Sequence, residues 1–257
     1  MSELNPYQPP VAPASAEAGA FSAAGRAVDA GRGWEWIAEG FALFKKQPGT
    51  WILILIVLIV CSVVISLVPI IGTLANLLLM QVIMGGVMLG CRALDNGESF
   101  EVGHVFAGFK QNTSDLVVLG VLALVGWIIA FIPAILIMGG GAFMTMMSGG
   151  GHMAHIGALG LTFVLAMLVA LALALPVYMA LWFAPALVVF NNLKPVDAMK
   201  ASFLACLKNI VPFLLYGIIL TVLCMVAAIP LGLGFLVLGP VAIASIYAGY
   251  RDIFVAG

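Results

Sequence analysis

The sequence predicts an all-α membrane protein, a helical bundle with six transmembrane spans. Of its 257 residues, 64% are hydrophobic and only 8% are Asp, Glu, Lys or Arg, whereas a soluble domain carries about 25% of these four residue types. A soluble core cannot bury so much apolar surface, but lipid can cover it. Six apolar segments approach the ~20 residues needed to cross a membrane. They cover about residues 51–71, 72–94, 116–138, 158–181, 210–229 and 231–250.

The first 31 residues differ in composition from the rest of the chain. They are rich in Pro and Ala and begin with Asn5-Pro6-Tyr7-Gln8-Pro9-Pro10, where closely spaced prolines favour an extended, solvated backbone. We expect residues 1–31 to form a disordered cytoplasmic tail and residues 32–257 to form one transmembrane domain. No cationic stretch precedes an apolar one in the first 20 residues, so no cleavable signal peptide is expected.

Proline and glycine mark the turns between paired spans. Pro69 and Gly72 separate the first two spans, and Pro230 with the following glycines separates the last two. The fourth apolar segment continues as far as residue 190 and is interrupted by Pro176 and Pro185. We expect one long helix kinked by these prolines; the alternative is a break at Pro185 into a short separate helix.

All charged side chains fall on one side of a six-span chain. They precede the first span, lie between the second and third or the fourth and fifth spans, or follow the sixth. Because cytoplasmic loops carry an excess of Lys and Arg, this side is predicted to face the cytoplasm, with both termini there. Five or seven spans would scatter the charges over both sides. No charge is expected inside the membrane, which disfavours a proton-coupled transporter built on buried carboxylates.

Amphipathic segments precede the first, third and fifth spans, at 34–46, 100–110 and 195–208. Each segment ends in two apolar residues spaced three apart and a lysine: Phe41, Phe44 and Lys45; Phe106, Phe109 and Lys110; Leu204, Leu207 and Lys208. Helices of this kind lie in the membrane interface with their apolar face toward the lipid tails. The chain is therefore predicted to contain three copies of an interfacial helix followed by a helical hairpin.

The predicted apolar faces follow α-helical spacing. They are Trp34, Ile37, Phe41 and Phe44 in the first helix, Val102, Phe106 and Phe109 in the second, and Val196, Met199, Phe203 and Leu207 in the third. Aromatic and cationic side chains anchor a protein at the interface. The predicted interfacial anchors are Trp34, Trp36, Phe41, Phe44, Phe106, Phe109, Tyr250 and Arg251.

Two sets of residues are candidates for binding. Polar side chains within the spans, Asn76, Gln81, Tyr178 and Tyr216, would favour a transporter or channel for a neutral small solute if they lined one cavity. The predicted outer loop at 138–155 holds Met144, Met146, Met147, His152, Met153 and His155. Thioethers and imidazoles suit Cu(I), so copper handling is a further hypothesis. The alternative is a flexible loop whose methionines contact lipid.

No motif for catalysis is recognisable. The sequence has no Walker loop, no HExxH and no paired acids within a span, so we expect no enzyme and no cofactor. A net charge of −1 disfavours nucleic-acid binding, which requires a basic surface. The expected function is that of an accessory or scaffold protein, whose partners are membrane lipids, other membrane proteins or a second copy of the chain.

Four short motifs carry a resemblance to a known family. They are Gly33-Trp34-x-Trp36-Ile37, Phe183-Ala184-Pro185-Ala186-Leu187, Pro195-x-x-Ala198-x-x-x-Ser202 and Tyr247-Ala248-x-Tyr250-Arg251-Asp252-Ile253-Phe254. Over about residues 30–255 the chain resembles a family of uncharacterised six-span proteobacterial inner-membrane proteins that end in this last motif. More distantly, it is similar to the membrane domain that accompanies some glycerophosphodiester phosphodiesterases. Their soluble catalytic domain is absent, so the resemblance implies a location and a fold, with no activity.

Overall fold

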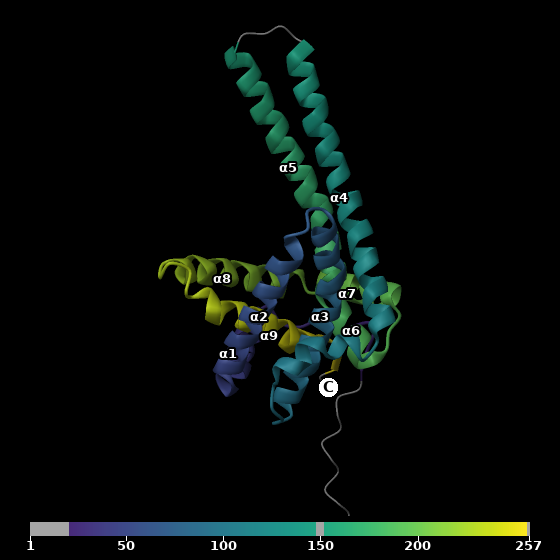
Figure 1. Cartoon of the computed structure of the whole chain (residues 1–257), viewed down its shortest axis with the longest axis vertical. Helices are drawn as coiled ribbons and strands as arrows, with labels where there is room; N and C mark the ends of the chain where they lie inside the picture. The colour runs from purple at the N-terminus through teal and green to yellow at the C-terminus, as the bar shows by residue number, and fades with distance from the viewer. Residues whose placement is uncertain (1–20, 148–151, 256–257) are drawn as a thin grey trace, which may run out of the picture.

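The computed structural model describes residues 21–147 and 152–255, and the regular elements of these residues are all helical (Figure 1). Apolar segments that cannot hydrogen-bond to lipid must satisfy their backbone internally, which an α-helix does. The elements are α1 (Arg32–Lys46), α2 (Pro48–Ser66), α3 (Ile71–Asp95), η1 (Val102–Phe109), α4 (Thr113–Met147), α5 (His152–Trp182), α6 (Ala184–Asn191), α7 (Pro195–Lys208), α8 (Ile210–Ala228), α9 (Phe235–Tyr250) and η2 (Arg251–Val255).

Five described segments are long and apolar enough to cross a membrane. They are α2, α3, residues 113–144 of α4, residues 159–191 of α5 with α6, and α8. The sixth predicted span corresponds to α9, which has 16 residues and is therefore about 24 Å long. It begins later than expected because Leu231 and Gly232 adopt positive φ angles of 53° and 81° in the turn after α8.

The fourth apolar segment is broken just before Pro185, as in the alternative that the sequence left open. Pro176 lies inside α5, as expected, but α5 ends at Trp182 and α6 begins at Ala184. The expectation of one long kinked helix is therefore wrong. The separate short helix is the one observed, because Pro185 suits the first turn of a new helix, where its missing N–H costs nothing.

Helices α4 and α5 form a hairpin, which we call the arm, that extends well beyond the other helices (Figure 1). With 35 and 31 residues, these helices are about 52 and 46 Å long. The predicted outer loop at 138–155 is wrong for most of its length, since α4 continues to Met147 and α5 starts at His152. Glycines 139–141 do not end α4, because glycine is tolerated within apolar helices.

The three amphipathic elements follow a cyclic packing pattern. The most extensive partner of η1 is α3, that of α7 is α5, and that of α1 is α9. Each element thus packs on the second helix of the preceding hairpin, and the first element closes the cycle on the last hairpin. Small residues allow the close approach: a Cβ on Gly40 of α1 would lie 2.6 Å from the Val241 carbonyl oxygen of α9.

The second amphipathic element differs from the predicted α-helix in its number of residues per turn. It is a 3₁₀-helix, with three residues per turn, so its inward face holds Val105 and Gly108 while Phe106 and Phe109 remain exposed. In α7 the small side chains, such as Ala198 and Ser202, face the protein. The larger predicted apolar face of α7 is partly exposed through Val196 and Leu207.

Residues 1–20 of the predicted disordered tail lie outside the described residues. Residues 21–31, which the sequence assigned to the same tail, pack against the C-terminal end of the chain. The Ser22 N–H donates to the Phe254 carbonyl at 2.9 Å, and the Arg26 N–H donates to that of Ile253 at 2.9 Å. The side chain of Asn209 accepts a hydrogen bond from the Val28 N–H through its Oδ1 and donates one to the Arg26 carbonyl through its Nδ2. We call residues 21–31 together with α1, η1, α6, α7 and η2 the collar.

Candidate functional site: a charged cluster in the collar

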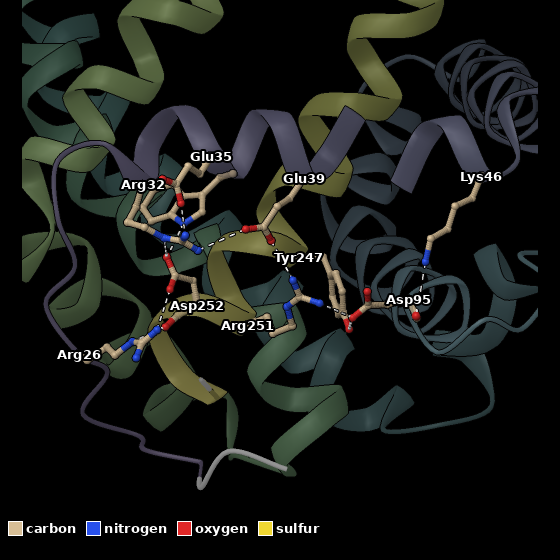
Figure 2. Close-up of polar contacts among 10 residues, drawn as sticks. Arg26, Arg32, Glu35, Glu39, Lys46, Asp95, Tyr247, Arg251 and Asp252 are labelled. Atoms are coloured by element: carbon tan, nitrogen blue, oxygen red, sulfur yellow. Dashed lines mark hydrogen bonds and ion pairs between the residues drawn. The ribbon is translucent and has the colours of Figure 1, made fainter. Parts of the chain in front are cut away.

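A buried aspartate is the centre of the polar structure in the collar. Asp252 is 5% exposed because α9 ends just before it and η2 turns it beneath α1. Arg26 Nη2 donates to its Oδ1 at 2.8 Å, and Arg32 Nε donates to its Oδ2 at 2.6 Å. Trp36 Nε1 donates to Oδ2 at 2.9 Å. These contacts join the N-terminal segment, α1 and the C-terminal element (Figure 2).

The surroundings of Asp252 favour its ionised form. Desolvation alone would raise its pKa, but the hydrogen bonds from Arg32, Trp36 and Arg26 outweigh this effect and hold the pKa below its usual value. Removing the carboxylate would leave two guanidinium groups without their shared counter-charge. Asp252 therefore stabilises the closure of the chain ends.

A second arginine bridge continues the cluster along α1 (Figure 2). Arg251 donates to Glu39 at 2.9 Å and to Asp95 at 2.6 Å. The Tyr247 hydroxyl donates to the same Asp95 carboxylate at 3.2 Å. Lys46 Nζ donates to the Leu94 carbonyl oxygen at 2.9 Å, at the C-terminal end of α3, where a cation also meets the negative end of the helix dipole.

The cluster alternates in sign and surrounds a small polar cavity. Arg32 also contacts Glu35 and Glu39, so each carboxylate of the cluster lies beside a cation. The cavity has a volume of about 410 Å³ and is lined by Arg26, Ala27, Val28, Asp29, Arg32, Glu39, Arg251 and Asp252. Because its three arginines face three acids, the lining has no net charge to select an ion. The arrangement holds together α1, α3, α9 and residues 21–31.

The predicted polar interior residues do not converge on one cavity. Asn76 donates to the Ser66 hydroxyl at 2.9 Å, within the α2–α3 hairpin. Tyr216 is buried and shares a 2.8 Å hydrogen bond with Ser245 of α9, whereas Tyr178 is exposed and packs edge-on against Trp127. Gln81 is half-buried in α3.

The predicted interfacial anchors divide into two groups. Trp36, Phe44 and Tyr250 are buried in the protein, so their assignment to the lipid interface is wrong; Trp36 and Tyr250 instead donate hydrogen bonds to Asp252 and Asn191. The anchors that remain exposed are Trp34, Phe41, Phe106 and Phe109. Arg251, the cationic anchor, is partly exposed and bridges two carboxylates.

The candidate copper ligands are only partly described. Met144 and Met147 are exposed at the end of α4, while the side chains of Met146, His152, Met153 and His155 lie outside the described residues. Among the described side chains, no group of three or more His, Cys, Asp or Glu could hold a metal ion. The copper hypothesis stays a prediction.

The charged cluster was missed because its members are far apart in the sequence. Arg26 and Asp252 are separated by 226 positions. One signal was present: the Arg251-Asp252 pair follows the last apolar segment, and Arg26, Arg32, Glu35 and Glu39 precede the first one. Placing both segments on one side of the membrane brings opposite charges together, although it does not choose the partners.

A charged collar joined to long apolar hairpins defines a multi-pass helical membrane protein. The chain is 32% identical over 197 residues to the probable inner membrane protein BTH_II0599 of Burkholderia thailandensis, covering 75% of this chain and 73% of that protein. It therefore belongs to this family of inner-membrane proteins. No protein-family model matches the chain, and neither does any solved structure.

Proposed function

We propose that the chain crosses the inner membrane six times. The cluster brings together Arg26, Asp95 and Asp252, which lie before the first hairpin, after it and after the last. Lys208, just before α8, donates to the Gly25 carbonyl at 2.8 Å and belongs to the same end. If α8 crosses the membrane, the chain must cross back through the short α9 to reach Asp252. This parity argument supports six spans rather than five.

The side that holds the collar is the cytoplasm in this proposal, because the described lysines and arginines gather there. A cysteine replacing Leu231, which is 97% exposed in the α8–α9 turn, should react with a membrane-impermeant maleimide in intact spheroplasts. A cysteine at exposed Asp197 in α7 should react only after permeabilisation. The reverse pattern would contradict the orientation, and labelling of both in intact cells would contradict the six-span topology.

The collar also supports a threefold repeat of amphipathic element and hairpin. The cyclic packing of η1 on α3, α7 on α5 and α1 on α9 is what three equivalent units arranged around a common axis would produce. The units differ in detail, since the second amphipathic element is a 3₁₀-helix. In such a repeat, an amphipathic element joins each hairpin to the collar.

We propose that the protein is an inner-membrane accessory or scaffold protein that engages lipids or the spans of partner proteins. The observation that carries this proposal is the presence of wide apolar grooves along the hairpins. One, of about 680 Å³, lies between α4 and α5 beside Phe131, Met138 and Phe163. Another, of about 490 Å³, joins Leu77 of α3 to Trp127 and Tyr178 of the arm. Hydrocarbon or another apolar helix would fill both.

Native mass spectrometry of the gently solubilised protein tests this function. We expect a retained lipid class or a reproducible partner chain, because either one would cover the apolar side chains that line these grooves. A second measurement uses the variant with Phe163→Ala and Met138→Ala, which widens the α4–α5 groove. This variant should retain less lipid or partner chain than the wild type. A wild-type chain that carries neither lipid nor partner would contradict the proposal.

The two alternatives from the sequence remain less supported. The dispersed positions of Asn76, Tyr178 and Tyr216 give no structural reason to favour transport of a neutral solute. Copper handling predicts that replacing His152 and His155 with Ala abolishes Cu(I) binding. An unchanged Cu(I) affinity in that variant, measured by competition with a chromophoric chelator, would exclude a site built on these histidines.

A further inference from the structure

A third groove, between α1 and the α8–α9 hairpin, differs from the other two in carrying a cation. It has a volume of about 590 Å³, within the roughly 300–1,000 Å³ of ligand-binding clefts. Its lining residues from α1 are Trp34, Ile37, Ala38, Phe41 and Lys45. The α8–α9 hairpin contributes apolar residues from Leu223 to Val241, together with Pro230 and Gly234 in and beside the turn.

Lys45 is the charged side chain of this groove, and it has no carboxylate partner among the described residues. The ion pairs of the collar use Arg26, Arg32, Arg251 and Lys194, and Lys46 is bonded to carbonyl oxygens of α3. The Lys45 ammonium instead lies 5.1 Å from the centre of the Phe41 ring. Its charge is therefore available to an anion at the groove.

The groove lies where α1 packs against both helices of the α8–α9 hairpin. Glycines bring α1 against both helices of the hairpin: a Cβ on Gly33 would lie 3.0 Å from the Tyr216 nitrogen of α8, and one on Gly40 would lie 2.8 Å from the Ser245 nitrogen of α9. The hairpin then continues beyond α1 to its turn (Figure 1). An interfacial α1 places Lys45 and Trp34 at headgroup depth, and the hairpin provides an apolar wall beside the acyl chains.

We propose that this groove binds a phospholipid with an anionic headgroup, its phosphate beside Lys45 and one acyl chain along α8 and α9. The inference rests on the proposed lipid-engaging function and adds the headgroup class and the site. A partner helix would fill the apolar part equally well but would leave the Lys45 charge against hydrocarbon. A basic side chain at the cytoplasmic end of an interhelical pocket is a known means of selecting anionic lipid.

The test is native mass spectrometry of the full chain released from vesicles of equimolar phosphatidylglycerol and phosphatidylethanolamine. The wild type should retain phosphatidylglycerol preferentially. Lys45→Ala should lower the ratio of retained phosphatidylglycerol to phosphatidylethanolamine about fivefold, the effect of one basic residue near a membrane surface. Ala38→Phe, at an exposed position of α1, should fill the groove and remove one retained lipid.

Two control variants keep the test specific. Lys200→Ala removes an exposed lysine of α7, and Val211→Phe adds a ring to an exposed position of α8 outside the groove; both should retain lipid as the wild type does. Unfolding midpoints show whether each variant is folded. Lipid retained without headgroup preference, or a preference that survives Lys45→Ala, would overturn this inference and leave the general lipid-engaging function standing. A wild-type chain that retains no lipid of either class would overturn both.

Discussion

The collar and the arm are both helical, but they differ in which side chains they bury and which they expose. The collar buries Trp36 and packs Phe254 against the neighbouring Phe183, and its Arg26 and Arg251 pair with Asp252 and Asp95. In the arm, Leu116 and Leu119 are buried near the start of α4, and farther along the buried seam consists of small residues such as Ala123, Ala130 and Ala166. Its outer surface is a continuous layer of exposed apolar side chains.

This contrast indicates where the fold draws its stability. The collar is held by specific contacts among protein groups, which should survive transfer from lipid into detergent. The arm is joined to the collar near its base, where Lys194 pairs with Asp115 and the Ser202 hydroxyl donates to the Met179 carbonyl. Farther along, its two helices meet through small packed side chains such as Ala130 and Ala166. The position of this farther part therefore depends on what surrounds it. The predictions below separate these two sources of stability.

Asp252→Asn should have the largest effect and should act on the collar. It keeps the shape of the side chain but removes the charge shared by Arg26 and Arg32 in a site that is 5% exposed. Breaking a buried ion pair from one side costs about 3–5 kcal/mol. The unfolding midpoint in detergent should fall steeply, while Asp197→Asn, at an exposed aspartate of α7, should leave it unchanged.

The same aspartate predicts a dependence on pH. Because its folded pKa lies below the usual value, its contribution is complete above the unfolded pKa of about 3.9 and is lost as the pH falls through the folded pKa. The difference in midpoint between wild type and Asp252→Asn should therefore be constant above about pH 5 and shrink below about pH 4. A difference that shrank near neutral pH would contradict the assignment of the effect to Asp252.

A lysine should be tolerated less well on the arm than in the collar, although the chosen arm position is the more exposed of the two. Ile129 is 63% exposed on α4 and Val196 is 49% exposed on α7. If Ile129 faces lipid near mid-membrane, Ile129→Lys should cost about 2.5–3.5 kcal/mol of insertion energy. Val196→Lys in the collar should stay within about 0.5 kcal/mol. Membrane-inserted yield measures both, and equal tolerance would mean that this part of the arm lies outside the membrane.

The sequence predicted those helices whose formation depends on the residues of the helix itself. Apolar length identified α2, α3, α4, α5 and α8, and Pro195 with Lys208 marked both ends of α7 correctly. The break near Pro185 remained an open alternative, because a proline can either kink a helix or start one.

Features that depend on tertiary contacts were not predictable in the same way. The buried faces of η1 and α7 follow from their neighbours rather than from their own apolar pattern, so Val105 and Ser202 face inward where larger side chains were expected to define the face. The order of residues 21–31 depends on a C-terminal element more than 220 positions away, for example through the Arg26–Asp252 contact. In the arm, apolar composition alone could not locate the helix ends at Met147 and His152.

Gly40→Ala should weaken the closure of the cycle between α1 and α9. The added Cβ would lie 2.6 Å from the Val241 carbonyl and 2.8 Å from the Ser245 nitrogen, and backbone atoms cannot rotate away. Overpacking of this kind costs about 1–3 kcal/mol. Gly49→Ala, where a Cβ would meet open space, is the matched control. Equal unfolding midpoints for the two variants would mean that α1 does not depend on this close contact.

Arg251→Lys should produce the smallest effect and shows how the bridge along α1 works. The two Nη atoms of Arg251 reach separate carboxylates, those of Asp95 and Glu39, whereas the compact ammonium of lysine cannot hold both at these distances. Because Arg251 is 43% exposed, solvent weakens each pair, and we expect a loss of about 1 kcal/mol in unfolding free energy. In a Glu39→Gln background the second carboxylate is already gone, so the same substitution should cost less. A cost unchanged by Glu39→Gln would mean that Arg251 acts through Asp95 alone, and α1 would then be held to the C-terminal end by Asp252 without this bridge.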